Sequence, residues 1–135
     1  MKIALPILVA LALAVAGSAL ATRNNATITI RHQTHGCHSW SLTGKTWAAS
    51  QSLTLVRGGV LTVVDNDVMS HKLIQLSGPK ASLAGVAMKH MGAMAHVGFP
   101  VKGTYVFTTK VGEDYMKGIK TTGEDNVLKL VVKVT

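Results

Sequence analysis

Two segments in the middle of the chain decide the fold: VLTVVDND at residues 60–67 and SHKLIQL at residues 70–76. Each segment contains a short run rich in Val, Leu, Ile and Thr, and such runs favour strands. The polar residues Asp65, Asn66 and Asp67 separate the two runs, and Asp and Asn are typical of turns. The segments therefore predict a strand over 60–64, a turn, and a second strand over 71–76.

The same pattern extends in both directions along the chain. Residues 26–31 and 127–134 alternate apolar and polar side chains, as half-buried strands do. Further strands are expected at 52–56 and 103–109, and only residues 81–94 could hold a short helix. Six or more short strands with turn residues between them predict an all-β protein, a single sandwich or barrel, with one short helix at most.

The N-terminal residues have the order typical of a secretory signal peptide. A positive start at Lys2 precedes an apolar run over residues 3–16 and the small-x-small triplet that ends at Ala21. We expect cleavage after Ala21, which leaves a domain of residues 22–135 in the periplasm or outside the cell. No second apolar run reaches the roughly 20 residues that a membrane-spanning helix needs, so we expect no membrane span after processing.

The chain is basic, with 14 Lys and Arg against 6 Asp and Glu and a formal net charge of +8. The lysines are spread along the chain among apolar residues, and there is no basic run with interleaved aromatic side chains. That distribution argues against nucleic acid as a partner. It favours a solvated positive surface that attracts an anionic protein partner.

The most informative polar residue is Cys37, the only cysteine, with His35 two residues before it and His38 directly after it. A single cysteine cannot form a disulfide within its own chain. Thiolate and imidazole together suit copper or zinc better than calcium or magnesium. Two further candidate ligands lie near predicted strand ends, His71 and Met116. If these loops meet at one end of a sandwich, their side chains can share one ion.

At these residues the chain resembles the cupredoxins, the small Greek-key β-sandwiches of blue copper proteins. The resemblance rests on residues 61–67 leading into residues 70–73, and on GTYVFTT at residues 103–109. It implies that His71 is the upstream copper histidine and that the strand over 103–109 leads to the copper cysteine. In this chain Thr109 stands at that cysteine position. The loop that follows has no histidine, and Met116 alone matches the family in type and rough position.

The cupredoxin resemblance also implies a way to rebuild the site. In that topology the first and third strands run parallel, so the end of the first strand lies at the same pole as His71. Cys37 would then replace the missing cysteine, and Met116 would be a weak axial ligand. Residues two apart on an extended chain face the same way, which favours His35 over His38 as the remaining ligand. The alternative is a cupredoxin-like fold whose site is lost or altered.

A second group of possible ligands lies in the segment MKHMGAMAH at residues 88–96. Thioethers favour Cu(I), so this segment could form a second copper-handling loop. The same spacing of methionines is also how a packing face of a short helix looks. The candidate residues are Met88, His90, Met91 and Met94.

The expected function is therefore that of an exported, copper-binding, cupredoxin-like protein for electron transfer or for copper holding and delivery. Its expected partner is an anionic redox or copper-exchange protein. A zinc-stabilised domain and a metal-free β-sandwich interaction module are the alternatives. We do not expect an enzyme. Cys37 and His38 are sequence neighbours without an evident orienting carboxylate, and no phosphate loop, zinc-protease helix or hydrolase elbow occurs.

Overall fold

The computed structural model describes residues 23–33, 36–116, 118 and 126–135. The predicted signal peptide and its cleavage site lie outside these residues, as does His35. Every regular element in the described ranges is a strand. Within the same ranges there is no helix with the length and hydropathy needed to cross a bilayer.

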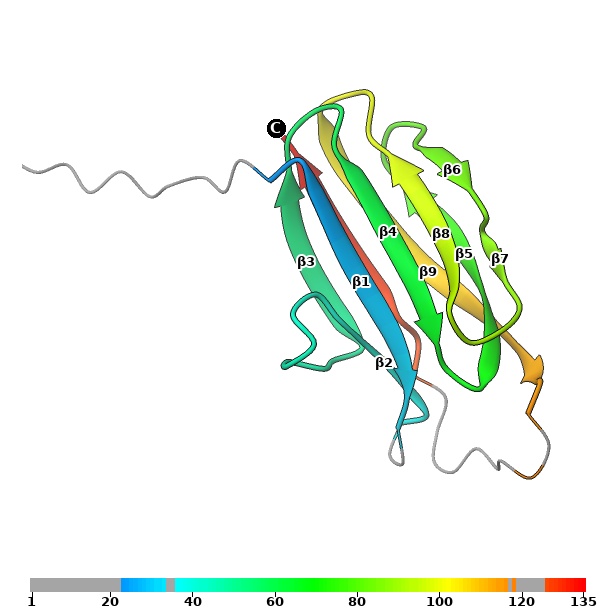
Figure 1. Ribbon diagram of the computed structural model, residues 1–135. Coiled ribbons are helices and arrows are strands. Elements are labelled where there is room, and N and C mark those ends of the chain that lie inside the picture. Colours follow the sequence, from blue (N-terminus) through cyan, green and yellow to red (C-terminus); the bar gives the residue numbers. More distant parts are fainter. Residues whose placement is uncertain (1–22, 34–35, 117, 119–125) are drawn as a thin grey trace, which may run out of the picture.

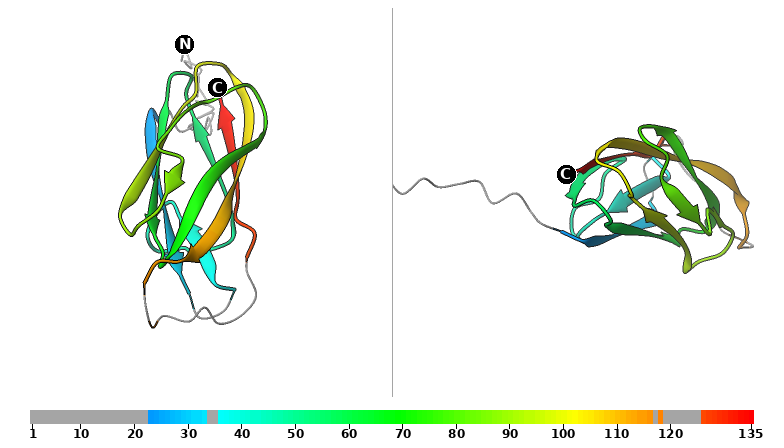
Figure 2. Two further views of the ribbon diagram at one scale, coloured as in Figure 1. Left: turned by 90° about the vertical axis from the view of Figure 1, so that its right-hand side faces the viewer. Right: turned by 90° about the horizontal axis from the view of Figure 1, so that it is seen from above.

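The described strands form two five-stranded sheets that stack face to face as a β-sandwich (Figure 1). Figure 2 shows the two layers from the side and from above. One sheet has the strand order β2-β1-β4-β8-β6 and the other the order β3-β10-β9-β5-β7. The strands are β1 (Asn25–His32), β2 (His38–Ser41), β3 (Ser50–Leu55), β4 (Val60–Asn66), β5 (Met69–Ser77), β6 (Ser82–Ala84), β7 (Ala87–Met88), β8 (Ala93–Gly98), β9 (Gly103–Asp114) and β10 (Lys129–Val134).

Two of the strand pairs are parallel, and both join segments that are far apart in the sequence. β1 runs parallel to β4, from the pair Asn25–Val60 to the pair Arg31–Asn66. β10 runs parallel to β3 in the other sheet. The β1–β4 pair confirms the predicted parallel arrangement of the first and third expected strands. It places the ends of β1 and β4 at one end of the sandwich, next to the start of β5.

Alternating side chains build the core between the sheets. In β9 the inward residues Tyr105 and Phe107 are fully buried, as the alternation predicts. Phe99 packs edge-on against both rings, with centroids 4.9 Å from Tyr105 and 6.0 Å from Phe107. The last strand buries Leu130, Val132 and Val134 on the same side. Side chains of this size contribute roughly 1.5–3 kcal/mol each on full burial, so these positions hold the two sheets together.

The prediction of a short helix over residues 81–94 is wrong. This stretch forms β6, β7 and the start of β8 instead. Gly85 and Gly92 adopt positive φ angles of 66° and 86°, which interrupt a right-handed helix. Strand β2 was not predicted at all. Its four residues are all buried, so they lack the alternation by which a strand is found in a sequence.

Candidate metal centre

The polar centre of the molecule lies at the turn between β4 and β5. Asp65 is an inward residue near the end of β4, and Asp67 follows directly after that strand. The Asp67 backbone N–H donates to Asp65 Oδ1 at 2.9 Å, and the Met69 N–H donates to Asp67 Oδ1 at 3.2 Å. These local bonds hold the turn, as Asx side chains commonly do. They also fix both carboxyl groups inside the protein, where each is completely buried.

Two buried imidazoles share one oxygen of Asp67. His38 Nδ1 lies 2.6 Å from Asp67 Oδ2, and His71 Nε2 lies 2.9 Å from the same atom. The two rings are perpendicular, with centroids 5.0 Å apart. His38 opens β2 and His71 belongs to β5, so the carboxylate links one sheet to the other.

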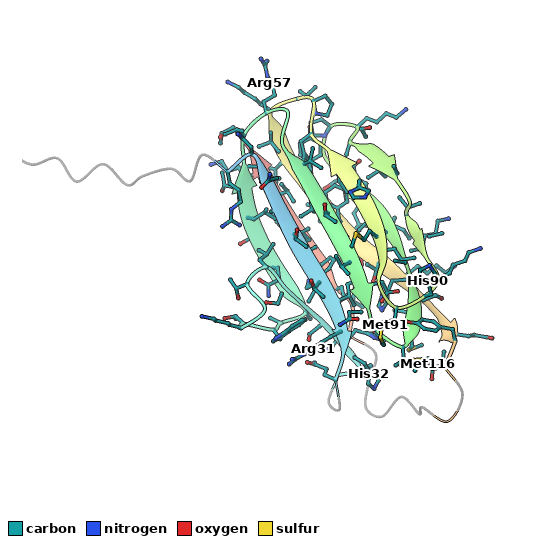
Figure 3. All side chains as sticks on the ribbon, in the orientation of Figure 1. Arg31, His32, Arg57, His90, Met91 and Met116 are labelled. Carbon is teal, nitrogen blue, oxygen red and sulfur yellow. The ribbon has the colours of Figure 1, made fainter. Side chains whose placement is uncertain are left out.

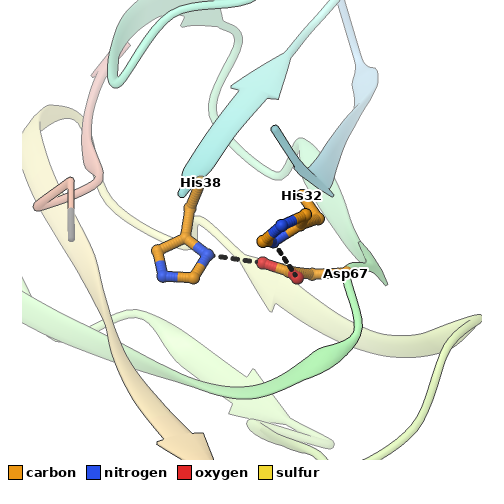
Figure 4. Close-up of side chains that lie close together, drawn as sticks. All are labelled: His32, His38 and Asp67. Atoms are coloured by element: carbon orange, nitrogen blue, oxygen red, sulfur yellow. Dashed lines mark hydrogen bonds and ion pairs between the residues drawn. The ribbon is translucent and has the colours of Figure 1, made fainter. Parts of the chain in front are cut away.

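A third imidazole approaches the other oxygen of this carboxylate. His32 Nδ1 lies 3.6 Å from Asp67 Oδ1, which is an ion-pair distance and too long for a hydrogen bond. Figure 4 shows His32 and His38 on two sides of Asp67. Among the described residues, His32 Nδ1 has no hydrogen-bond partner although the atom is buried. The side chain is 23% exposed, so His32 is the member of the group that reaches toward solvent.

Thr109 sets the orientation of His71. Its Oγ1 lies 2.9 Å from His71 Nδ1, on the opposite side of the ring from Asp67. A carboxylate only accepts hydrogen bonds, so His71 Nε2 must carry the proton that points to Asp67. In the neutral ring Nδ1 is then an acceptor, and the Thr109 hydroxyl donates to it. The residue at the expected cysteine position therefore acts as a hydrogen-bond partner of the histidine.

The two carboxyl groups have opposite protonation behaviour. Burial pushes the pKa of Asp67 upward, but hydrogen bonds from His38, His71 and the Met69 backbone outweigh it and leave the pKa well below its usual range. Burial and the nearby charge of Asp67 raise the pKa of Asp65 to about 7, against hydrogen bonds from the backbone of Asp67 and His71. Asp65 Oδ2 has no hydrogen-bond partner among the described residues. The centre therefore holds one firmly ionised carboxylate and one that titrates near neutrality.

Tyr115 closes the centre from the end of β9. Its hydroxyl donates to the backbone carbonyl of Asp67, and its N–H donates to the Val68 carbonyl at 3.2 Å. Burial, with the negative charges of Asp65 and Asp67, raises the pKa of the Tyr115 hydroxyl to about 12. The phenol therefore stays protonated and keeps the residues after β9 against the β4–β5 turn.

The chemistry of this group suits a transition metal. The ligand atoms of His32, His38 and Asp67 all lie within 4.8 Å of one another. Imidazole nitrogens and a carboxylate oxygen are a donor set for Cu(II) or zinc. His71 touches the same carboxylate and would hold it in place as an outer hydrogen-bond partner. The His-His-Asp cluster could therefore hold a metal ion, and the donors alone do not choose between copper and zinc.

The structure places Cys37 beside this group, in the hairpin loop between β1 and β2. The residue is completely buried and has a φ angle of 48°, which is uncommon for a residue other than glycine. The Gln33 N–H donates to the Cys37 carbonyl at 2.8 Å, which closes the hairpin. Asn126 Nδ2 donates to the His38 carbonyl at 2.8 Å and ties the segment before β10 to the same hairpin.

The predicted ligands meet this arrangement in different ways. His38 and His71 come together on Asp67, although 33 residues separate them in the sequence. The prediction that Cys37 and His71 share an ion stays a prediction, because the described cluster contains neither of them. Met116 follows Tyr115 at the same end of the molecule and is 40% exposed (Figure 3). His35 lies outside the described residues.

Three members of the centre are not predicted from the sequence: Asp67, Asp65 and His32. Asp65 and Asp67 were assigned to an ordinary turn, where acidic residues are normally solvated. The spacing of four between Asp67 and His71 was a usable signal, as was the position of His32 at the end of a predicted strand that runs parallel to the one before Asp67. Thr109 was singled out only as a missing cysteine.

The second group of predicted ligands divides into buried and exposed residues. Met88 is completely buried in the core. Met91 and Met94 are 45% and 51% exposed, and His90 is also exposed. In Figure 3, His90 and Met91 lie on the turn that leads into β8.

Comparison with known proteins finds likenesses among solved structures, and no likeness among family models or curated proteins. Auracyanin B, a cupredoxin of known structure, aligns over 84% of this chain and 91% of its own chain, at 17% sequence identity and a TM-score of 0.39. The assignment of this molecule as a two-sheet β-sandwich rests on its own strand order.

Proposed function

We propose that this chain is an exported, copper-binding, cupredoxin-like protein that holds copper for electron transfer or for delivery to another protein. The observation that carries the proposal is the buried Asp67 carboxylate, which meets three imidazoles at one end of the sandwich. Catalysis is not part of the proposal, because His38, His71 and Asp67 are buried and leave little surface for a substrate.

The residues of the centre offer two alternative ligand sets for copper. His32, His38 and Asp67 would supply nitrogen and oxygen ligands, which suit Cu(II). Cys37 is the residue before His38, and its thiolate would add the sulfur ligand of a blue copper site if it joins them. Bound copper would supply a carrier for one electron. The protein's own part is to bury the centre and to fix the ring of His71, through Asp67 on one side and Thr109 on the other.

The surface outside His71 supports an anionic protein partner. A hollow of about 240 Å³ lies there between β5, β7 and β9. Its lining combines the apolar residues Met88 and Val111 with three lysines, Lys72, Lys89 and Lys110. Lys72 and Lys110 are direct cross-strand neighbours, an arrangement that like charges disfavour. A partner with an acidic surface would relieve this repulsion and come to rest beside a histidine of the centre.

The test is a titration of the exported protein with Cu(II), followed by visible absorption, electron paramagnetic resonance and calorimetry. We expect one tight site that His38→Gln and Asp67→Asn remove. His90→Gln is the control, because the His90 side chain is exposed and its Nδ1 bonds to the Met91 carbonyl, away from the buried centre. An intense visible band that Cys37→Ser abolishes assigns a thiolate ligand, and a weak band that Cys37→Ser leaves unchanged assigns a nitrogen–oxygen site.

Two other outcomes would contradict the copper proposal. Zinc found in the isolated protein, with copper unable to displace it, would favour a zinc-stabilised domain. No tight binding of either metal would favour a metal-free interaction module, in which the histidines and Asp67 serve only as a buried hydrogen-bond network.

A further inference from the structure

Two exposed thioethers and one exposed imidazole lie on the turn at residues 90–93 and on strand β8, which follows it. Met91 and Met94 are 45% and 51% exposed, and His96 is exposed as well. Methionine is more often a core residue, where its flexible side chain fills gaps. The buried centre uses none of these three side chains, so their exposure calls for a separate explanation.

The turn that carries Met91 is fixed by backbone hydrogen bonds. The Ala93 N–H donates to the His90 carbonyl at 3.0 Å, so residues 90–93 form a β-turn with Met91 in its second position. Gly92 has a φ angle of 86° in the third position, as a type II turn requires. The Gly92 N–H donates to the Asp65 carbonyl at 2.7 Å. The turn is therefore attached to the strand that carries the buried centre.

The alternation of β8 places Met94 and His96 on one face. Ala95 and Val97 are fully buried, so the residues between and beside them point outward. Side chains two residues apart on a strand lie on the same face and start about 7 Å apart. Thr62 Oγ1 lies 3.4 Å from His96 Nδ1 on the neighbouring strand β4. A bond there leaves His96 Nε2 as the nitrogen that can turn toward Met94.

We propose that Met91, Met94 and His96 form a surface site for Cu(I), separate from the buried centre. Two thioethers and one imidazole make a soft donor set, which selects Cu(I) over calcium, magnesium or manganese. The choice of copper as the natural metal rests on the proposed function. The position of the site deepens that function, because Ala93 is the cross-strand neighbour of Asp65. Copper held on the outer face would lie one strand away from the carboxylates of the buried centre.

Met88 and His90 are not part of this site. Met88 is buried and pairs with His71 in the other sheet. His90 Nδ1 lies 3.2 Å from the Met91 carbonyl. The site thus differs from the predicted copper-handling loop: it loses two of the four predicted residues and gains His96.

The test uses Ag(I), which has the ligand preference of Cu(I) without its oxidation chemistry. Ag(I) is titrated into the exported protein in the presence of a competing chelator. We expect the double variant Met94→Leu/His96→Gln to weaken Ag(I) binding at least about tenfold, which corresponds to 1.4 kcal/mol. The control His90→Gln should bind like the parent protein. All the altered side chains are exposed, so the variants should fold normally.

A second readout locates the ion on the protein. Peroxide converts exposed methionine to its sulfoxide, which peptide mass spectrometry detects residue by residue. We expect Ag(I) to protect Met91 and Met94 in the parent protein. In Met94→Leu/His96→Gln, Met91 should lose most of that protection.

The two proposals can fail separately. The variant His38→Gln/Asp67→Asn lacks the buried centre and should still bind Ag(I) at the surface site. Ag(I) binding that survives Met94→Leu/His96→Gln but disappears in His38→Gln/Asp67→Asn would overturn the surface site, as would absence of Ag(I) binding in the parent protein. Ag(I) binding at Met91, Met94 and His96 in a protein that fails to bind Cu(II) would support the surface site and overturn the copper role of the buried centre.

Discussion

The two ends of the sandwich are closed in different ways. At the end near residues 57–59, backbone groups bond to backbone groups: Arg57 N–H to the Thr135 carbonyl at 2.9 Å, and Gly58 N–H to the Phe99 carbonyl at 2.8 Å. At the Asp67 end, carboxylates, imidazoles and hydroxyls make the links. The first end depends little on which side chains are present. The second end exists only with particular side chains, which is why it is the candidate site.

The sharpest way to break this contrast is to remove the carboxylate. Asp67→Ala leaves two buried imidazoles without their acceptor, and we expect a loss of about 3–5 kcal/mol in the free energy of unfolding. Arg57→Ala, an exposed change at the opposite end, should stay within about 0.5 kcal/mol. Urea unfolding of metal-free protein at pH 7 measures both. If Asp67→Ala does not fold, Asp67→Asn serves instead. Similar losses of unfolding free energy at the two ends of the sandwich would contradict the difference between them.

The second test uses pH. The pKa of Asp65 is raised to about 7 in the folded protein, against about 3.9 in the unfolded chain. The folded state therefore binds the extra proton, and the stability that Asp65 contributes falls as the pH rises toward 7 and above. We expect the free energy of unfolding of the metal-free parent protein to fall by about 2–3 kcal/mol between pH 5 and pH 8, relative to that of Asp65→Asn. A constant difference between the two unfolding curves across this range would contradict the buried, titrating carboxyl.

Two glycines, one at each end of the sandwich, allow a direct comparison of how tightly the ends are packed. Gly36 and Gly58 have similar φ angles, 70° and 83°, so Ala costs similar backbone strain at both. A Cβ on Gly58 meets open space, whereas a Cβ on Gly36 collides with the Asn126 side chain. We expect Gly36→Ala to destabilise the protein by about 1–2 kcal/mol more than Gly58→Ala. Equal thermal shifts would mean that Asn126 does not pack against the hairpin of the centre.

The smallest expected effect comes from two neighbouring threonines, Thr108 and Thr109. Their valine variants separate a loss of stability from a loss of metal affinity. Thr109→Val removes the hydroxyl on His71, and Thr108→Val removes a 2.6 Å hydrogen bond to the Leu128 carbonyl. Each should cost about 1 kcal/mol in unfolding experiments. Only Thr109→Val should weaken metal binding, by about tenfold, because it frees the orientation of a histidine of the centre. Equal metal affinities in the two variants would place His71 outside the functional group.

Much of the fold was readable from the sequence because its strands alternate. The alternation predicts which face of each strand points inward. Examples are Tyr105 and Phe107 on one strand and Leu130 and Val132 on another. Strand β2 and the strands over residues 82–94 are not readable from the sequence, since they are short and do not show a clear alternation of apolar and polar residues. What makes them strands is pairing with β1, β5 and β8.

The candidate site was only half readable. His38 and His71 were singled out, one as a neighbour of Cys37 and the other through the cupredoxin resemblance. Asp67 was not, because an acidic residue in a turn is normally exposed and only tertiary packing reveals its burial. The parallel pairing of β1 with β4 brings His32 near Asp67. The register of this pairing cannot be predicted from the sequence alone.

The position of β10 in the middle of its sheet has a consequence for how the chain folds. β10 lies between β3 and β9, and its parallel partner β3 is separated from it by most of the domain. Neither β3 nor β9 can complete its hydrogen-bonding ladder until β10 has been synthesised. Topologies dominated by such distant pairings fold slowly, in milliseconds to seconds. In a nascent chain of this kind the strands of that sheet stay incompletely paired, with hydrophobic surface exposed, until β10 arrives.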